Sequence, residues 1–431
     1  MSDPALPPVA SDKPCPACAR PLAPSGEWPV WCAHCEWNLI PTSSEKRFRK
    51  MAAGWRQIST ALSDRLFNEL HSDPLDRSAH RTARASISLA LAYALATLVH
   101  SLSLALLALG VWVLWRPWTN LFAVIGAFAA VLLAWAVRPK LSQPPEHVVS
   151  RDEAPTLYLL ADRLAGAMRT DPPHGIAISA DFNASYGRYG WRRRPYVELG
   201  LPLLLVLEPR QRAAVLAHEL SHGANGDPMR SLYLHQAVDT VATWSAVIRP
   251  HTLAAAGGLV GLLSIPFELA ALALSETLLW TAHGIWLLVL RESQRAEYLA
   301  DRLAASVVGT EAMCSALDAL HPDDAVDLAI QRMALNGSEE GLSTLLRDTV
   351  GQVPDSERER RRRLARRQGW RVDSSHPPTA LRIDMLASRD SIPPSSRLHS
   401  YEEEQLDREL ATLEPDVKRR LVNHYLVGIH G

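Results

Sequence analysis

The chain has 431 residues, a length typical of two or three structural modules rather than one small domain. Its 45 Lys and Arg residues nearly balance its 46 Asp and Glu residues, so the net charge of -1 gives no general attraction to nucleic acid or anionic lipid. We therefore expect no specific nucleic-acid partner. Hydrophobic residues make up 47% of the chain, but they gather in a few long blocks, so the average conceals the informative segments.

The first 45 residues contain two closely spaced cysteine pairs, Cys15 with Cys18 and Cys32 with Cys35. Each pair has the Cys-x-x-Cys spacing of a zinc knuckle, and two knuckles can close a tetrahedral site of four thiolates. The segment has too few aliphatic residues to fold on a hydrophobic core, which favours a metal over four unliganded thiols. We predict a structural zinc ribbon at 1–45, with a possible protein partner, because four thiolates leave no position for a catalytic water.

Two long apolar stretches follow a charged helical connector at 46–84. Residues 85–115 and 117–137 contain no Asp, Glu, Lys or Arg. About 20 apolar residues span a hydrocarbon core, so we predict a transmembrane hairpin at 85–138, with a buried soluble hairpin as the alternative. Basic residues flank both outer ends, whereas only Arg116 lies between the stretches, which predicts that both ends face the cytosol.

This topology predicts a multi-pass protein of the inner (cytoplasmic) membrane, in contact with the lipid bilayer. Its N-terminus and everything after residue 140 would share the cytosol. Residues 1–12 lack a basic start followed by an apolar run, so we expect no secretory signal there. Two cysteine pairs in a chain of this length also indicate reduced thiols rather than a disulfide framework.

The segment 139–390 has the pattern of a folded domain. We expect a helix at 154–168, strands at 176–179 and 196–199, and a helix from about residue 209. A second apolar region at about 250–290 has charge-free arms at 250–267 and 277–290. It predicts a second hairpin that spans the membrane or, alternatively, is amphipathic or re-entrant, because the carboxylates between its arms are costly in lipid.

The remaining sequence is charged and helical. Residues 391–431 are expected to form a charged helical tail. The arginine-rich run 358–367 is interleaved with Glu357 and Glu359, which is typical of a solvated helical face, and we assign it no function.

The sharpest chemical motif is His218-Glu219-Leu220-Ser221-His222 on the helix expected from residue 209. Positions i and i+4 share one helical face, so both imidazoles can bind one zinc ion while Glu219 faces the metal-bound water. The alternative is a surface helix with solvated side chains. A catalytic zinc needs a third protein ligand, and Glu297 can supply it, with Asp301 one turn later orienting a ligand imidazole. An ordinary exposed carboxylate pair is equally compatible with that spacing.

The chain resembles the HtpX/Ste24-like membrane metallopeptidases, the M48 gluzincins, from about residue 85 to residue 390. The resemblance rests on the order of its parts: two spans, the 214–222 motif, a second apolar hairpin, Glu297 to Asp301, and His376-Pro377-Pro378. It implies that His218, His222 and Glu297 bind zinc, that Glu219 is the general base and that Asp301 supports a ligand.

Two further site residues come from the same resemblance. Asn183 and Ala184 resemble the start of a family segment that binds an extended peptide by backbone pairing, although turn-forming residues on an edge strand give the same pattern. His376 resembles a family histidine that stabilises the oxyanion, although a residue before two prolines can simply begin a helix. The ribbon lies outside the family pattern.

The predicted fold class is a mainly α integral membrane protein, with an α+β gluzincin domain, a small sheet and an N-terminal ribbon. The predicted function is zinc-dependent endopeptidase cleavage of unfolded or membrane-derived polypeptides by a Glu-activated water, with one catalytic and one structural Zn²⁺. One alternative is a non-catalytic membrane scaffold or adaptor. Another is a Ste24-like processing protease for lipidated C-termini, a branch that usually has more spans.

Overall fold

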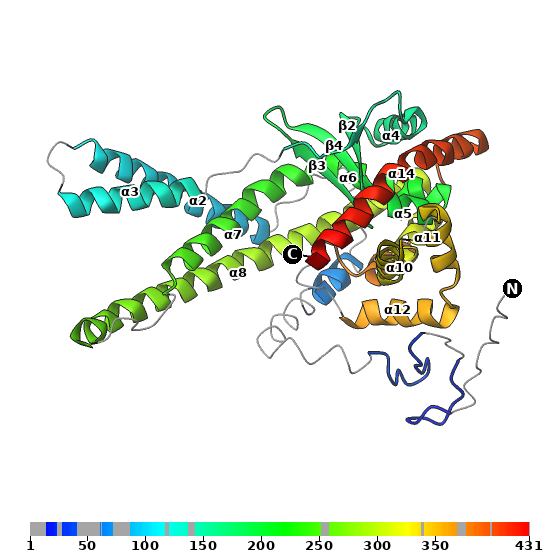
Figure 1. Cartoon of the computed structure of the whole chain (residues 1–431), viewed down its shortest axis with the longest axis horizontal. Coiled ribbons are helices and arrows are strands. Elements are labelled where there is room, and N and C mark those ends of the chain that lie inside the picture. Colours follow the sequence, from blue (N-terminus) through cyan, green and yellow to red (C-terminus); the bar gives the residue numbers. More distant parts are fainter. Residues whose placement is uncertain are drawn as a thin grey trace. The chain divides into compact units, whose positions relative to one another are not determined.

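The structure is a computed structural model, and its described residues form two compact units built from segments distant in sequence. The first unit comprises residues 1–74, 143–225 and 294–431, and the second comprises 75–142 and 226–293. Figure 1 gives the element labels used below. The described residues are 14–23, 28–40, 61, 63–71, 87–116, 120–136, 143–250, 258–337, 340–368, 376–396 and 399–430.

The second unit is helical and strongly apolar. It contains α2 (Ile87–Leu114), α3 (Leu121–Ala136), α7 (Asp227–Ile248) and the first part of α8 (Gly258–Val308). Two helical segments, Ser88–Leu114 and Ser264–Val308, are long and apolar enough to cross a membrane, and Leu121–Trp135 is a shorter apolar helix. Many large apolar side chains of α2 and α3 point outward, as lipid-facing residues would.

The second apolar region differs from the expected hairpin. No turn separates the two arms expected at 250–267 and 277–290, because residues 258–308 form the single helix α8. The intervening carboxylates have polar partners: Ser264 of α8 donates a hydrogen bond to Glu268, and Arg249, directly after α7, lies 2.9 Å from Glu276. The apolar half of α8 instead packs against α7, where the buried Ser245 and Ser275 donate hydrogen bonds to each other's carbonyl oxygens.

The first unit contains a small mixed sheet that positions the catalytic helix. The strands are β1 (Val148–Val149), β2 (Gly175–Ser179), β3 (Ala184–Tyr189) and β4 (Arg194–Gly200), in the order β1-β2-β4-β3. β2 and β4 are parallel, and the other pairs are antiparallel. The two strands predicted from the sequence are β2 and β4. β3 is an edge strand, so one side of it has no strand partner among the described residues.

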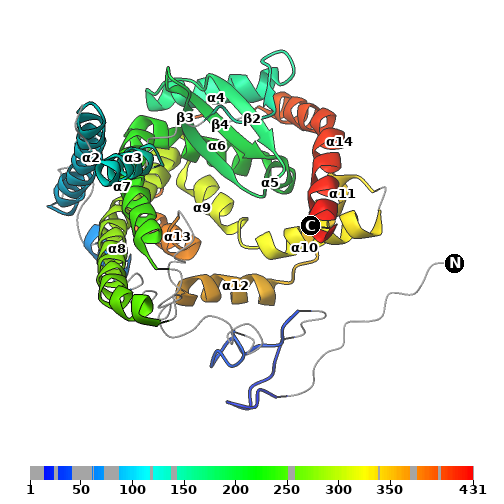
Figure 2. The same ribbon diagram turned by 60° about the vertical axis from the view of Figure 1, so that its left-hand side comes forward.

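The helices of the first unit surround this sheet. Figure 2 shows α6 beneath the sheet, with α9, α10 and α12 following on the side of α6 away from the strands. Buried Ile176, Val197 and Leu216 belong to the single large core that joins the sheet to α6. The helices are α4 (Pro155–Met168), α5 (Leu201–Val206), α6 (Pro209–Asn225), α9 (Thr310–Asp318), α10 (Asp323–Asn336), α11 (Leu342–Gly351), α12 (Asp355–Gln368), α13 (Thr379–Ala387) and α14 (Ser400–His430), together with the end of α8.

The expected charged tail at 391–431 is instead part of this core. α14 buries Leu406, Leu410 and Leu421 against the same cluster as the sheet. Its buried Glu409 accepts hydrogen bonds from the backbone N–H groups of Thr156 and Leu157, at the start of α4. A carboxylate at a helix N-terminus satisfies donors that have no partner within the helix. α14 is therefore an amphipathic helix whose buried face includes the carboxylate of Glu409.

Candidate active site and cysteine cluster

Helix α6 holds the first three site residues. It begins at Pro209, whose missing N–H suits the first helical position, and Gly226 follows it in the left-handed conformation, with φ of 73°. His218 and His222 are four residues apart on this helix, which places their Nε2 atoms 3.3 Å apart. His218 and Glu219 are buried, which excludes the solvated surface helix that the motif alone allowed.

Glu297 approaches this pair from α8. Its Oε2 lies 3.4 Å from His218 Nε2, and its Oε1 lies 3.5 Å from His222 Nε2. Ligands placed about 2.0–2.1 Å from a tetrahedral zinc are separated from each other by about 3.3 Å. The three donor groups therefore have the mutual spacing of three ligands of a tetrahedral zinc ion, which leaves the fourth coordination position for water.

The surroundings of these groups also favour a cation. Glu297 is buried, and the ring nitrogens of His218 and His376 lie 3.4 and 2.7 Å from its Oε2. Burial and the nearby Arg382 lower the pKa of His218, but hydrogen bonds to Asp301 and Glu297 outweigh them and raise it to about 10. Two buried carboxylates thus favour positive charge at the position that a zinc ion would take.

Asp301 supports the cluster from one turn further along α8. Its Oδ1 lies 3.0 Å from His218 Nδ1, which is the ring nitrogen directed away from Glu297 and His222. Arg382 of α13 forms a two-pronged ion pair with the same carboxylate, at 2.7 Å from Nε and 2.5 Å from Nη2. Glu297 and Asp301 are both buried, so they do not form the exposed acidic pair that the sequence also allowed. Nothing local to residue 382 in the sequence indicates a partner on α8, so the role of Arg382 emerges only from the fold.

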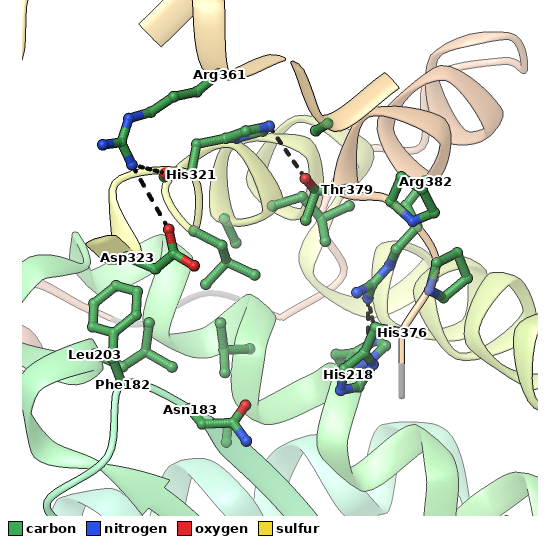
Figure 3. A pocket seen from close by; sticks show the side chains of 18 of the residues that line it. Phe182, Asn183, Leu203, His218, His321, Asp323, Arg361, His376, Thr379 and Arg382 are labelled. Atoms are coloured by element: carbon green, nitrogen blue, oxygen red, sulfur yellow. Dashed lines mark hydrogen bonds and ion pairs between the residues drawn. The ribbon is translucent and has the colours of Figure 1, made fainter. Parts of the chain in front are cut away.

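His376 and Asn183 both line one cavity, together with His218 and Glu219 of the catalytic helix. His376 Nδ1 is 2.7 Å from Glu297 Oε2, so this ring lies beside the ligand set and is itself close enough to offer a nitrogen to a metal. Asn183 and Ala184 stand at the start of the edge strand β3. Figure 3 shows Asn183, His218 and His376 around the cavity, which has a volume of about 390 Å³ and a largely apolar lining.

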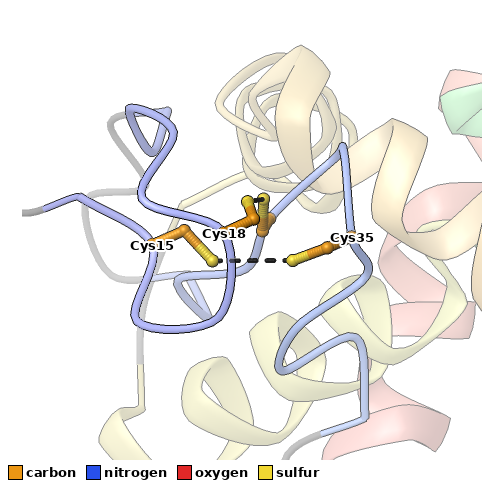
Figure 4. A group of neighbouring side chains, drawn as sticks. Cys15, Cys18 and Cys35 are labelled. Carbon is orange, nitrogen blue, oxygen red and sulfur yellow. Dashed lines mark hydrogen bonds between the residues drawn. The ribbon is translucent and has the colours of Figure 1, made fainter.

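The N-terminal cysteines form a second cluster. Cys15 Sγ lies 3.6 Å from Cys35 Sγ, and Cys18 Sγ lies 3.6 Å from Cys32 Sγ, with all four within 4.8 Å of one another (Figure 4). Thiolates about 2.3 Å from a tetrahedral zinc are about 3.8 Å apart, so the spacing fits that ion. No disulfide joins them.

The two halves of the cysteine cluster repeat one backbone pattern. Cys15 and Cys32 each accept a hydrogen bond at their carbonyl from the residue four positions later, Ala19 or Glu36. Those two residues both have positive φ, 57° and 58°. The cluster is thus built from two matching knuckles.

Comparisons with known proteins agree with this geometry. The model of the family described as "Peptidase family M48" matches residues 160–390, more than half of the chain. "Protease HtpX" of Histophilus somni (strain 2336) is 23% identical over 287 residues, which are 63% of this chain and 85% of the relative. "Protease HtpX" of Nitrosococcus oceani is 27% identical over 276 residues, which are 62% of this chain and 83% of the relative.

A further relative matches over a shorter region. The "Protease HtpX homolog" of Pyrobaculum aerophilum is 29% identical over 206 residues, 47% of this chain and 53% of the relative. No solved structure matches the chain. The matched region contains the motif of α6, both carboxylates of α8 and the histidine and arginine near α13. The chain therefore belongs to peptidase family M48, and it is a metalloprotease.

Proposed function

We propose that the chain is a zinc-dependent endopeptidase in which His218, His222 and Glu297 hold one catalytic zinc ion. The observation that carries this proposal is the convergence of their donor atoms, 3.3 to 3.5 Å apart, from two helices far apart in sequence. A zinc ion bound there would acidify a water molecule and polarise the scissile carbonyl.

The chain's own residues supply the proton transfers and the alignment. Glu219 lies next to His218 on α6 and lines the cavity, where it accepts the proton of the attacking water and passes it to the leaving amine. Asp301 accepts a hydrogen bond from His218 Nδ1, which fixes the ring orientation and leaves Nε2 free to bind metal. His376 borders the same cavity and donates a hydrogen bond to the developing oxyanion.

The edge strand β3 suggests how a polypeptide substrate binds. An extended peptide can add to its unpaired side through backbone hydrogen bonds, which depend little on side-chain identity. Asn183 and Ala184 begin this strand and border the cavity, so a peptide paired there would run past Glu219. Unfolded or membrane-derived polypeptides meet this requirement, because their backbone groups are available for pairing.

The apolar helices and the cysteine cluster complete the proposal. α2, α3 and the apolar part of α8 with α7 would lie in the inner membrane, with the catalytic domain and the N-terminus in the cytosol. The four cysteines would hold a structural zinc ion. Burial of Glu219 beside two imidazoles, within a peptidase family, favours hydrolysis over a scaffold role. Cleavage of a prenylated peptide would instead support the processing alternative.

Glu219→Gln tests the proposal directly. This variant keeps the size of the side chain but cannot accept the water proton, so we expect proteolysis of an unfolded protein such as casein to fall by about 10²- to 10⁴-fold. Its zinc content should be unchanged. Glu208→Gln, just before the start of the same helix and exposed, is the matched control and should retain full activity. Full proteolysis by Glu219→Gln would refute the proposed mechanism.

A further inference from the structure

The cysteine ribbon packs against one face of α12. Trp31 is buried and donates a hydrogen bond from Nε1 to the carbonyl of Ser356, at 3.1 Å. Arg360 Nη1 donates to the carbonyl of Leu39 at 2.8 Å, and Arg363 donates to that of Ala33. The arginine-rich run is therefore not the solvated face that its composition indicated, because part of it is the surface on which the ribbon lies.

A second face of α12 lines the substrate cavity. Arg361, Leu364 and Ala365 all contribute to its wall. At about 100° per residue, these three are centred roughly 120° around the helix from Ser356, Arg360 and Arg363. Figure 3 shows Arg361 with His321 at the end of the cavity away from His218 and His376. One helix thus separates the ribbon from the cavity.

Buried Glu357 connects the two faces. Its carboxylate accepts hydrogen bonds from Arg360 at 2.6 and 2.8 Å, and from Arg361 Nε at 2.8 Å. Arg361 Nη1 in turn donates a hydrogen bond to the carbonyl of His321. The Nε2 atom of His321 lies 3.2 Å from Thr379 Oγ1, and both residues line the cavity. A continuous set of contacts therefore runs from the ribbon backbone at Leu39 to two residues that line the cavity.

We propose that the ribbon is a positioning element for the cavity wall, so that the metal state of the four cysteines controls how well the peptidase binds polypeptide substrates. Glu357 and Arg360 are the positioning residues, since they act through Arg361. The ribbon can form only with metal on its cysteines, and losing it removes the partners of Trp31, Arg360 and Arg363 at once. The ribbon lies outside residues 160–390, so this control is an addition to the family domain. The inference rests on the proposed function for its kinetic consequence only.

The first test removes the ribbon's metal site and leaves the catalytic residues intact. For the full-length Cys15→Ser/Cys18→Ser variant, we expect zinc content to fall by about one ion per chain. Hydrogen–deuterium exchange of the α12 amides should accelerate by about tenfold or more, with α4 unchanged. The KM for an unfolded polypeptide should rise by roughly 3- to 10-fold, with kcat changed less than about twofold, because coupling through packed networks has this size.

The second test breaks the contact and keeps the metal. Trp31→Ala and Arg363→Ala should each retain full zinc content but show the same faster exchange in α12 and a higher KM. Trp37→Ala is the matched control, because this ribbon indole is 37% exposed and makes no hydrogen bond to α12 among the described residues. It should match the wild type in both readouts. Arg363→Lys should restore part of the wild-type KM.

The outcomes separate this inference from the proposed function. Exchange in α12 is measured without catalysis, so it reports on the ribbon even if the chain cleaves nothing. Wild-type exchange in α12 for both the cysteine and the Trp31→Ala variants would overturn the inference. A fall in kcat at constant KM would also overturn it, since that pattern indicates damage to the catalytic residues rather than a displaced wall.

Discussion

Replacing Asp301 by Asn tests whether this buried carboxylate organises the zinc site. Asp301 accepts the Nδ1 hydrogen of His218 and forms the two-pronged ion pair with Arg382. An amide has the same shape but no charge, so Arg382 would remain buried with Glu297, 3.7 Å away, as its nearest remaining carboxylate among the described residues. The substitution should therefore weaken both zinc binding and folding.

The two effects have different sizes. Loss of a hydrogen-bond partner behind a ligand histidine lowers metal affinity by about 10- to 100-fold, or about 1.4 to 2.7 kcal/mol. Removing one partner of a buried ion pair lowers the free energy of unfolding by about 3 to 5 kcal/mol. If the unpaired cation causes that loss, Asp301→Asn/Arg382→Met should recover part of the stability without recovering zinc affinity.

Zinc affinity would be measured by competition with a coloured chelator, and stability by denaturant unfolding of the metal-free protein. Asp384→Asn is the matched control, because Asp384 forms a similar two-pronged pair with Arg366 that is partly exposed. It should lower the free energy of unfolding by less than about 1 kcal/mol and leave zinc affinity unchanged. Equal behaviour of Asp301→Asn and the wild type in both assays would refute the role assigned to Asp301.

Three further predictions concern α14 and the oxyanion. Glu409→Ala removes the acceptor for two N–H groups at the start of α4 and should lower the free energy of urea unfolding by about 1 to 2 kcal/mol; no change would contradict its capping role. The hydrogen-bonded ion pair with Arg163 lowers the pKa of Glu402 to about 2, so its stabilisation is present above pH 4.5 and lost as the pH falls towards 2. Thermal unfolding of Glu402→Gln should therefore depend less on pH in that range, and an unaltered acid profile would contradict this assignment. His376→Ala should lower kcat by about a hundredfold while zinc content stays constant, and undiminished kcat would exclude oxyanion stabilisation.

The parts of the site that depend on local spacing could be predicted from the sequence. His218 and His222 face one metal because four residues make about one helical turn, whatever surrounds the helix. The cysteine knuckles are similarly local. Glu297 was a candidate ligand from its own helix, but only the family resemblance favoured it over an exposed carboxylate, because no rule of spacing connects it with a motif 75 residues earlier. Arg382 became a candidate only when α13 and α8 were seen to meet at Asp301.

The arginine-rich run 358–367 was predicted to be a solvated face, but part of it is covered by the cysteine ribbon. A run of arginines normally faces water because burying a charge is costly. Here Glu357 neutralises Arg360, and the carbonyl of Leu39 accepts its remaining hydrogen bond from a segment more than 300 residues away in sequence. Long-range partners of this kind leave no periodic signal. The continuous helix α8 was not predicted, because Pro266, Glu268 and Glu276 interrupt the apolar sequence. In the structure Pro266 lies inside the helix, and Ser264 and Arg249 contact the two carboxylates.

The most direct test of the central claim is the zinc content of purified wild-type, His222→Ala and His376→Ala proteins. His222 and His376 both lie beside Glu297, but only His222 shares a helical face with His218. We predict about two zinc ions per chain in the wild type and in His376→Ala, and about one in His222→Ala, because the cysteine and histidine sites load independently. An undiminished zinc content in His222→Ala, or loss of an ion in His376→Ala, would contradict the assigned ligand set.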